Sequence, residues 1–187
     1  MLTLKSELHE ALRAARATNL ETTRGLSEHD LRRPLTASGA NVLGVLKHLG
    51  GMEYGYLGEA FGRSLPREIP GDVNLAGAAD LWVRADESSA FILAWYTEAC
   101  GVADETIASH DLDAVGRVEH FAEGHQTTTL AAMMLRVLNE ELRHGGHLDI
   151  LRELIDGADE PARIARIHAA AEPFRPPEQL SRPNLHH

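Results

Sequence analysis

One stretch of the chain restricts its fold more than any other. Between residues 129 and 155, seven residues recur at alternating steps of four and three, the period of one helical face. They are Met133, Val137, Glu140, His144, His147, Leu151 and Leu154. This spacing predicts a long helix from about Thr129 to Ile155, ended by Asp156 and Gly157, whose seam faces other helices.

Three earlier segments also have a helical period, and they lie at about 4–24, 42–62 and 79–102. In the third, one stripe is formed by Leu81, Ala85, Ser88, Ile92, Trp95 and Ala99. Arg84 and Glu87 are expected to face solvent on the opposite side of this helix. Four amphipathic segments with connections of different length predict an all-α fold, a four-helix bundle.

The remaining segments are expected to be connections. Residues 65–77 are rich in proline and glycine and predict a surface loop, and residues 110–126 are either a short hairpin or an ordered loop. Residues 160–171 predict a short helix, and the proline-rich tail at about 172–187 has no regular structure. We expect a single domain over 1–187 with its core at about 1–157.

The composition excludes several classes of protein. The 28 acidic and 18 basic residues give a net charge of -10, which disfavours binding to nucleic acid or to anionic membranes. The N-terminal segment is charged throughout and is not a secretory signal. One cysteine, Cys100, cannot form an internal disulfide, and it is interpreted as a small packing residue. We therefore expect a soluble, cytoplasmic protein.

Polar residues interrupt the apolar faces of two helices. Glu140 and His144 are four residues apart, so their side chains project from one face and can share an ion. His48 lies on the face of its helix that also carries Val45, Leu49, Met52 and Tyr56. Packing of the two faces would bring His48, Glu140 and His144 together as a metal site with an open position, because a buried carboxylate is costly unless paired or metal-bound.

Other interpretations of these residues remain open. A single core histidine is more often a hydrogen-bonded packing residue than a metal ligand, and Glu140 could pair with Arg143. His147 is three residues from His144 and could replace Glu140 as a ligand or support the site from behind. Glu141 points about a third of a turn from Glu140 and is the weaker candidate.

Glycines and further histidines also stand out. Gly145 and Gly146 each cost about 1 kcal/mol in a helix relative to alanine, which indicates either a close approach of another group or a harmless distortion. The irregular segment contains His120, Glu123 and His125, whose spacing fits no metal motif and favours a solvated loop. The terminal pair His186 and His187 is excluded from the functional argument.

Two motifs resemble a known family. The stretch 41–49 (NVLGVLKHL), with Glu53 nearby, and the stretch 140–152 (EELRHGGHLDILR) are similar to the DinB-like superfamily of metalloenzymes. The closest likeness is to an actinobacterial-type branch and to the mycothiol-dependent maleylpyruvate isomerases. The resemblance implies a DinB-like bundle in which His48, Glu140 and His144 hold the metal. Many members have histidine at the position of Glu140, whereas the isomerases have glutamate.

The resemblance also implies a function. We expect one divalent metal ion, zinc first, with nickel, manganese or iron as alternatives, and a low-molecular-weight thiol such as mycothiol or bacillithiol as co-substrate. The expected enzyme is a thiol transferase or isomerase, or a hydrolase-like relative, that acts on a small molecule as a homodimer. The alternatives are a non-catalytic metal- or ligand-binding protein of the stress response and a purely structural helical dimer.

Overall fold

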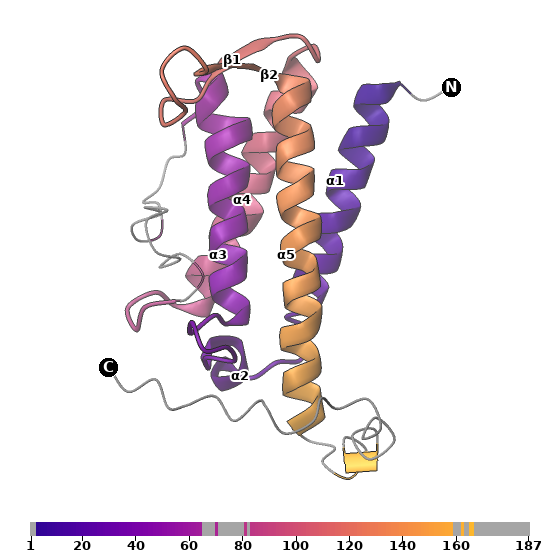
Figure 1. Ribbon diagram of the computed structural model, residues 1–187, viewed down its shortest axis with the longest axis vertical. Coiled ribbons are helices and arrows are strands. Elements are labelled where there is room, and N and C mark those ends of the chain that lie inside the picture. The colour runs from indigo at the N-terminus through magenta and orange to yellow at the C-terminus, as the bar shows by residue number, and fades with distance from the viewer. Residues whose placement is uncertain are drawn as a thin grey trace, which may run out of the picture. The chain divides into compact units, whose positions relative to one another are not determined.

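The computed structural model describes residues 3–64, 70, 81, 83–158, 162 and 165–166. It confirms the all-α bundle: the four long helices are α1 (Leu4–Glu21), α3 (Val42–Glu53), α4 (Ser89–Ser109) and α5 (Leu130–Ala158). As far as residue 152, these helices form one compact unit, and α3 and α5 lie in front of α4 in Figure 1. No helix in the described ranges is long and apolar enough to cross a membrane.

The first helix begins at a cap and ends earlier than its sequence pattern indicates. The hydroxyl group of Thr3 accepts a hydrogen bond from the backbone of Ser6, which satisfies one free N–H at the helix start. The helix ends at Glu21, and turns lead to Gly25, whose φ of 74° suits a residue without a side chain. The sequence pattern did not predict the short helix α2 (Glu28–Arg32) that follows.

The second predicted helix is present to its expected end, but in three parts. Asn41 caps α3, and the helix then widens into a π-helical turn, η1 (Tyr54–Gly58), and tightens into a 3-10 turn, η2 (Glu59–Phe61). Gly62 ends the segment with a φ of 75°. Almost the whole of α3 is buried, because it packs against α4 as well as facing α5.

The third helix begins later than predicted. α4 starts at Ser89, since the side chain of Ser88 accepts a hydrogen bond from the backbone N–H of Phe91. Residues 83–88 form no helix, and the predicted positions 79, 80 and 82 lie outside the described residues. Glu87 was expected to face solvent, and this prediction is wrong: its side chain is buried and pairs with the buried Lys47.

The connection to α5 is a short hairpin, one of the two alternatives expected for it. Strand β1 (Val115–Arg117) pairs antiparallel with β2 (Thr127–Thr129), and Val115 lies opposite Thr129. The hydroxyl group of Thr129 accepts from the backbone N–H of Ala132 at 3.3 Å and caps α5. The histidines of the connection, His120 and His125, are exposed, as the solvated-loop interpretation predicted.

The buried face of α5 differs from the predicted seam. Met133, Val137, His144 and Leu151 are buried, but His147 and Leu154 are exposed, and Glu141 and Leu148 are fully buried instead. Side chains of α1 and α4 reach Glu141 from the other side of α5, so that its buried face is wider than one seam.

The end of the chain is described only in part. α5 continues one residue past Gly157, to Ala158. Of the predicted helix 160–171, the structure describes residues 162, 165 and 166, which are helical. The tail 172–187 lies outside the described residues, as does the loop 65–77 except for Pro70.

Candidate metal centre

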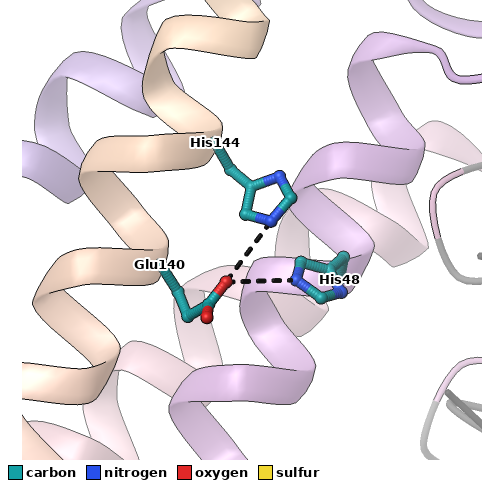
Figure 2. A group of neighbouring side chains, drawn as sticks. All are labelled: His48, Glu140 and His144. Carbon is teal, nitrogen blue, oxygen red and sulfur yellow. Dashed lines mark ion pairs between the residues drawn. The ribbon is translucent and has the colours of Figure 1, made fainter.

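Three side chains meet between α3 and α5. His48 comes from α3, and Glu140 and His144 come from successive turns of α5 (Figure 2). Glu140 Oε2 lies 3.4 Å from His144 Nε2 and 3.9 Å from His48 Nε2. The two imidazole rings have their centroids 4.5 Å apart. One ligand atom from each residue lies within 4.8 Å of the other two, so the three predicted residues form one cluster.

This geometry fits a divalent ion. Nitrogen and oxygen ligands at about 2.1 Å from a tetrahedral ion are about 3.4 Å from one another. The separations of 3.4 and 3.9 Å are close to this value and are longer than a good hydrogen bond. All three side chains are mostly buried, with exposed fractions of 11% for His48, 19% for Glu140 and 9% for His144. The donor set of two imidazoles and one carboxylate suits zinc, nickel, manganese or iron.

The position of His48 is held by the packing of α3 on α4. The indole Nε1 of Trp95 donates a hydrogen bond to the backbone oxygen of Lys47 at 3.1 Å. A side chain at Gly50 would collide with the same indole ring, so glycine allows α4 to approach this turn of α3. On the side chain of Lys47, Nζ donates to Glu87 Oε2 at 2.9 Å. His48 is therefore flanked by residues that are fixed in the core.

His147 is a neighbour of the cluster and not a member of it. Its Nδ1 atom lies 3.1 Å from Nδ1 of His144, on the side of that ring away from Glu140, and the two rings meet edge to face. An imidazole that binds a metal through one nitrogen usually donates its other N–H to an acceptor, which fixes the ring. His147 can supply that acceptor for His144.

A buried network behind the cluster holds α5 in place at Glu141. The hydroxyl group of Tyr96 donates to Glu141 Oε2 at 2.8 Å, and Nδ2 of Asn19 donates to the same atom at 2.6 Å. Asn19 also donates to the backbone oxygen of Glu141 at 3.1 Å. Burial and the neighbouring Glu53 carboxylate raise the pKa of Glu141 to about 8, so this carboxyl group is protonated at neutral pH.

The network continues into an ion cluster. Arg16 binds Glu53 through two hydrogen bonds of 2.7 and 2.6 Å and donates to Asp104 at 2.6 Å. Burial raises the pKa of Glu53 in spite of this pairing. The guanidinium group of Arg16 stabilises the charged form of Glu53.

The sequence patterns missed most of this network. Arg16 and Asn19 continue the apolar stripe of α1 after Leu12, at steps of four and three, and both are buried. Two polar residues on a buried stripe signal a polar partner on the facing helix, and that signal was available in the sequence. The weaker carboxylate candidate, Glu141, is the fully buried one, and it is satisfied by hydrogen bonds within the bundle.

The side of the cluster toward the hairpin carries an arginine. The guanidinium group of Arg136, one turn before Glu140, lies 5.0 Å from the ring centroids of both Tyr56 and Phe121. The hydroxyl group of Tyr56 lies 3.3 Å from Nε2 of His120. Within the described part of the chain, no carboxylate pairs with Arg136 at salt-bridge distance, so its N–H donors can face a ligand.

The cysteine is not suited to nucleophilic chemistry. Burial and the neighbouring Glu53 carboxylate raise the pKa of the Cys100 thiol well above its ordinary value. A neutral thiol is a poor nucleophile, in agreement with its interpretation as a packing residue. A thiol reaction at this protein would need a thiol from outside the chain.

Comparisons with known proteins support the resemblance. The structure is similar to the crystal structure of a conserved protein from Enterococcus faecalis, with a TM-score of 0.59 and 14% sequence identity over 84% of this chain and 99% of that chain. At this identity the likeness concerns the fold alone. No curated protein sequence matches the chain.

The family itself is identified by a sequence profile. The profile described as mycothiol-S-transferase matches residues 7–157, which include all of α3 and α4, nearly all of α1 and α5, and the cluster of His48, Glu140 and His144. This range is most of the 187 residues. The chain therefore belongs to the mycothiol S-transferase family, a DinB-like family.

Proposed function

We propose that this protein is a metal-dependent transferase of the cytoplasm that joins the thiol of mycothiol to a small electrophile. One observation carries the proposal: two imidazoles and a carboxylate converge within 4.8 Å, in a chain of the mycothiol S-transferase family. Zinc is the first candidate for the metal, because tetrahedral sites with three protein ligands and one open position are typical of catalytic zinc.

The charge of the ligand set suits a thiol substrate. Two neutral imidazoles and one carboxylate carry a total charge of -1, whereas three imidazoles carry none. When bound, a divalent ion lowers the pKa of a thiol at its open position and so supplies a nucleophile at neutral pH. With Glu140 among the residues that would hold a divalent ion, the site would keep one net positive charge, which suits one anionic sulfur.

The residues of the chain position the reacting groups. His48 and His144 hold their Nε2 atoms toward Glu140 Oε2, and the burial of all three excludes most water from the side facing the core. In the reaction, the sulfur–carbon bond forms as the bond from carbon to its leaving group breaks, and the leaving group keeps the electron pair. The thiol proton passes to solvent.

The proposal is tested by measuring metal and activity together. Protein purified without a histidine tag is analysed for metal and is incubated with mycothiol and 2-chloroacetamide, and the chloride released is measured. We expect about one metal ion per chain and a rate above that of the uncatalysed reaction, both lost in His48→Ala. His125→Ala, a change at an exposed histidine of the hairpin connection, should retain both.

Two results would contradict the proposal. Metal content that is unchanged in His48→Ala and His144→Ala would remove the proposed site. A metal-loaded protein that conjugates mycothiol no faster than buffer would leave a metal-binding protein without transferase activity.

A further inference from the structure

Two aromatic rings hold the side chain of Arg136. Its guanidinium carbon lies 5.0 Å from the ring centroid of Tyr56 and 5.0 Å from that of Phe121, and the two ring centroids are 6.0 Å apart. A guanidinium group is attracted to ring faces at this distance. Because Tyr56 is buried and Phe121 packs against the core, these contacts fix the position of the cation on the surface.

The donors of this guanidinium group are not used within the described part of the chain. No hydrogen bond or ion pair there involves Arg136. Glu140, the carboxylate one turn later on α5, is turned toward the two imidazoles of the candidate metal centre (Figure 2). The hydroxyl group of Tyr56 lies 3.3 Å from Nε2 of His120. An arginine that is held in place while its donors stay unpaired indicates a ligand with acceptor atoms.

This arginine and the candidate metal centre share one surface of α5. Arg136 and Glu140 are four residues apart, so their side chains are neighbours on one helical face, with Cβ atoms about 5–6 Å apart. No residue of the helix stands between them on that face. Arg136 is exposed, and the side chain of Glu140 is 19% exposed. A group bound to Arg136 therefore lies one helical turn from the candidate metal ligands.

The charge and shape of this site select a carboxylate. The fork of N–H groups on a guanidinium matches the two oxygens of a carboxylate, and such pairs are short and strong. Arg117, in the same connection as Phe121, is paired with Glu119 and adds no free charge. One arginine thus balances one negative charge. A phosphate group carries nearly two negative charges at neutral pH, and the carboxylate of Glu140 would repel the second.

On this basis, and resting on the proposed transferase function, we infer that Arg136 binds a carboxylate of the electrophile. Mycothiol carries no carboxylate, so the acid is the second substrate. The substrate class is a small carboxylic acid whose reacting carbon is several bonds away from the carboxylate. In the transfer, the thiol sulfur bonds to that carbon, chloride or another leaving group departs with the bonding electron pair, and the thiol proton goes to solvent. The carboxylate is unchanged and orients the molecule.

The inference is tested with two electrophiles that differ in charge. N-chloroacetylglycine ends in a carboxylate and N-chloroacetylglycinamide in a neutral amide of nearly the same shape, and both have the same reacting carbon. The kcat/KM with mycothiol should be roughly tenfold higher for the acid, because a charge-assisted pair replaces a neutral contact. The ratio should fall as salt is added, since the arginine is exposed. Equal kcat/KM values for the two compounds would overturn the inference.

Two matched variants locate the preference. Arg136→Gln removes the guanidinium group and should abolish the preference for the acid. Arg143→Gln removes the same charge from another exposed arginine of α5 and should keep the preference. Because the ratio compares two substrates on one protein, a partial loss of folded protein does not change it. An equal loss of preference in both variants would mean that the overall charge attracts the acid, and would overturn the assignment to Arg136.

A binding measurement separates this inference from the proposed function. N-acetylglycine has a carboxylate but no leaving group and cannot react, so its binding is followed by NMR on the Nε–H group of Arg136 and on the ring of Phe121. Saturable shifts at both residues, absent with N-acetylglycinamide, support the carboxylate site even if no electrophile is conjugated. Conjugation without these shifts would retain the transferase and overturn the carboxylate site.

Discussion

The Nδ1 atom of His147 faces the Nδ1 atom of His144 at 3.1 Å, while Nε2 of His144 faces Glu140. The two nitrogens of one imidazole are thus assigned to different tasks, one toward the candidate metal and one toward a neighbouring ring. We therefore expect replacement of His144 and replacement of His147 to lower the metal affinity by different amounts.

We expect His48→Ala and His144→Ala to abolish metal binding, because each removes a ligand atom. His147→Ala should weaken the affinity by about 10–100-fold, as is usual when a residue that orients a ligand is lost. The measurement is isothermal titration with zinc, with His125→Ala as the control. Equal losses for His144→Ala and His147→Ala, together with unchanged binding by Glu140→Gln, would reassign the ligands.

Metal affinity should fall in acid, because protons compete with the ion for the same imidazole nitrogens. An imidazole in water has a pKa of about 6.5, so the stabilisation by added zinc should decline below roughly pH 6. The measurement is the melting temperature with and without zinc from pH 7.5 to 5. Stabilisation that is constant over this range would exclude histidine ligands.

Asp104 should make the fold sensitive to stronger acid. Partial burial opposes its ionisation, but hydrogen bonds with His9 and Arg16 outweigh burial and lower the pKa of this carboxyl group. A lowered pKa in the folded state contributes stability above the ordinary value of about 3.9, and this stability is lost as the pH falls through the lowered value.

The matched variant for this effect is Asp104→Asn. We expect its melting temperature at pH 6 to be a few degrees lower than that of the natural chain. The difference between the two should shrink as the pH falls toward 2.5, because the natural chain then loses the same charge. A difference that grows in acid would mean that the ion cluster does not stabilise the fold.

Gly145 and Gly146 should respond differently to alanine. A methyl group at Gly145 would lie 2.7 Å from Oδ1 of Asn19, whose amide is held by two hydrogen bonds with Glu141. A methyl group at Gly146 meets no atom within 4 Å. Gly146→Ala should stabilise the protein by up to about 1 kcal/mol through helix propensity, and Gly145→Ala should be destabilised by about 1–2 kcal/mol through overpacking.

The urea midpoints of the two glycine variants decide this point. If Gly145→Ala is as stable as Gly146→Ala, the side chain of Asn19 is able to move away from the added methyl group. The close contact of α1 with α5 would then not explain the glycine at position 145. This test also distinguishes the two explanations for the glycine pair that the sequence left open.

Replacing both residues of the buried ion pair, Lys47 and Glu87, should destabilise the protein less than replacing Lys47 alone. Lys47→Met leaves a buried carboxylate without its cation, and a loss of about 3–5 kcal/mol in the free energy of unfolding is expected. The double variant with Glu87→Leu should recover part of this loss, because neither charge then remains buried. Urea denaturation of both variants measures the difference, and identical values would show that the pair is not coupled.

The sequence by itself determined the helices and the grouping of His48, Glu140 and His144. Helical periods and capping residues act over a few neighbours, so both ends of α1 and α5 and the start of α3 were predicted to within three residues. The spacing of four also places Glu140 and His144 on one face, and His48 was found as an exception on an apolar face.

Tertiary structure alone decided which polar groups are buried. A periodic pattern states which residues share a face, but the rotation of each helix about its axis depends on what packs against it. Asn19 and Tyr96 converge on α5 from two other helices and bury Glu141, while His147 is left exposed. In the same way, Glu87 is buried because it pairs with Lys47, a partner that is forty residues away in the chain and that a local pattern cannot identify.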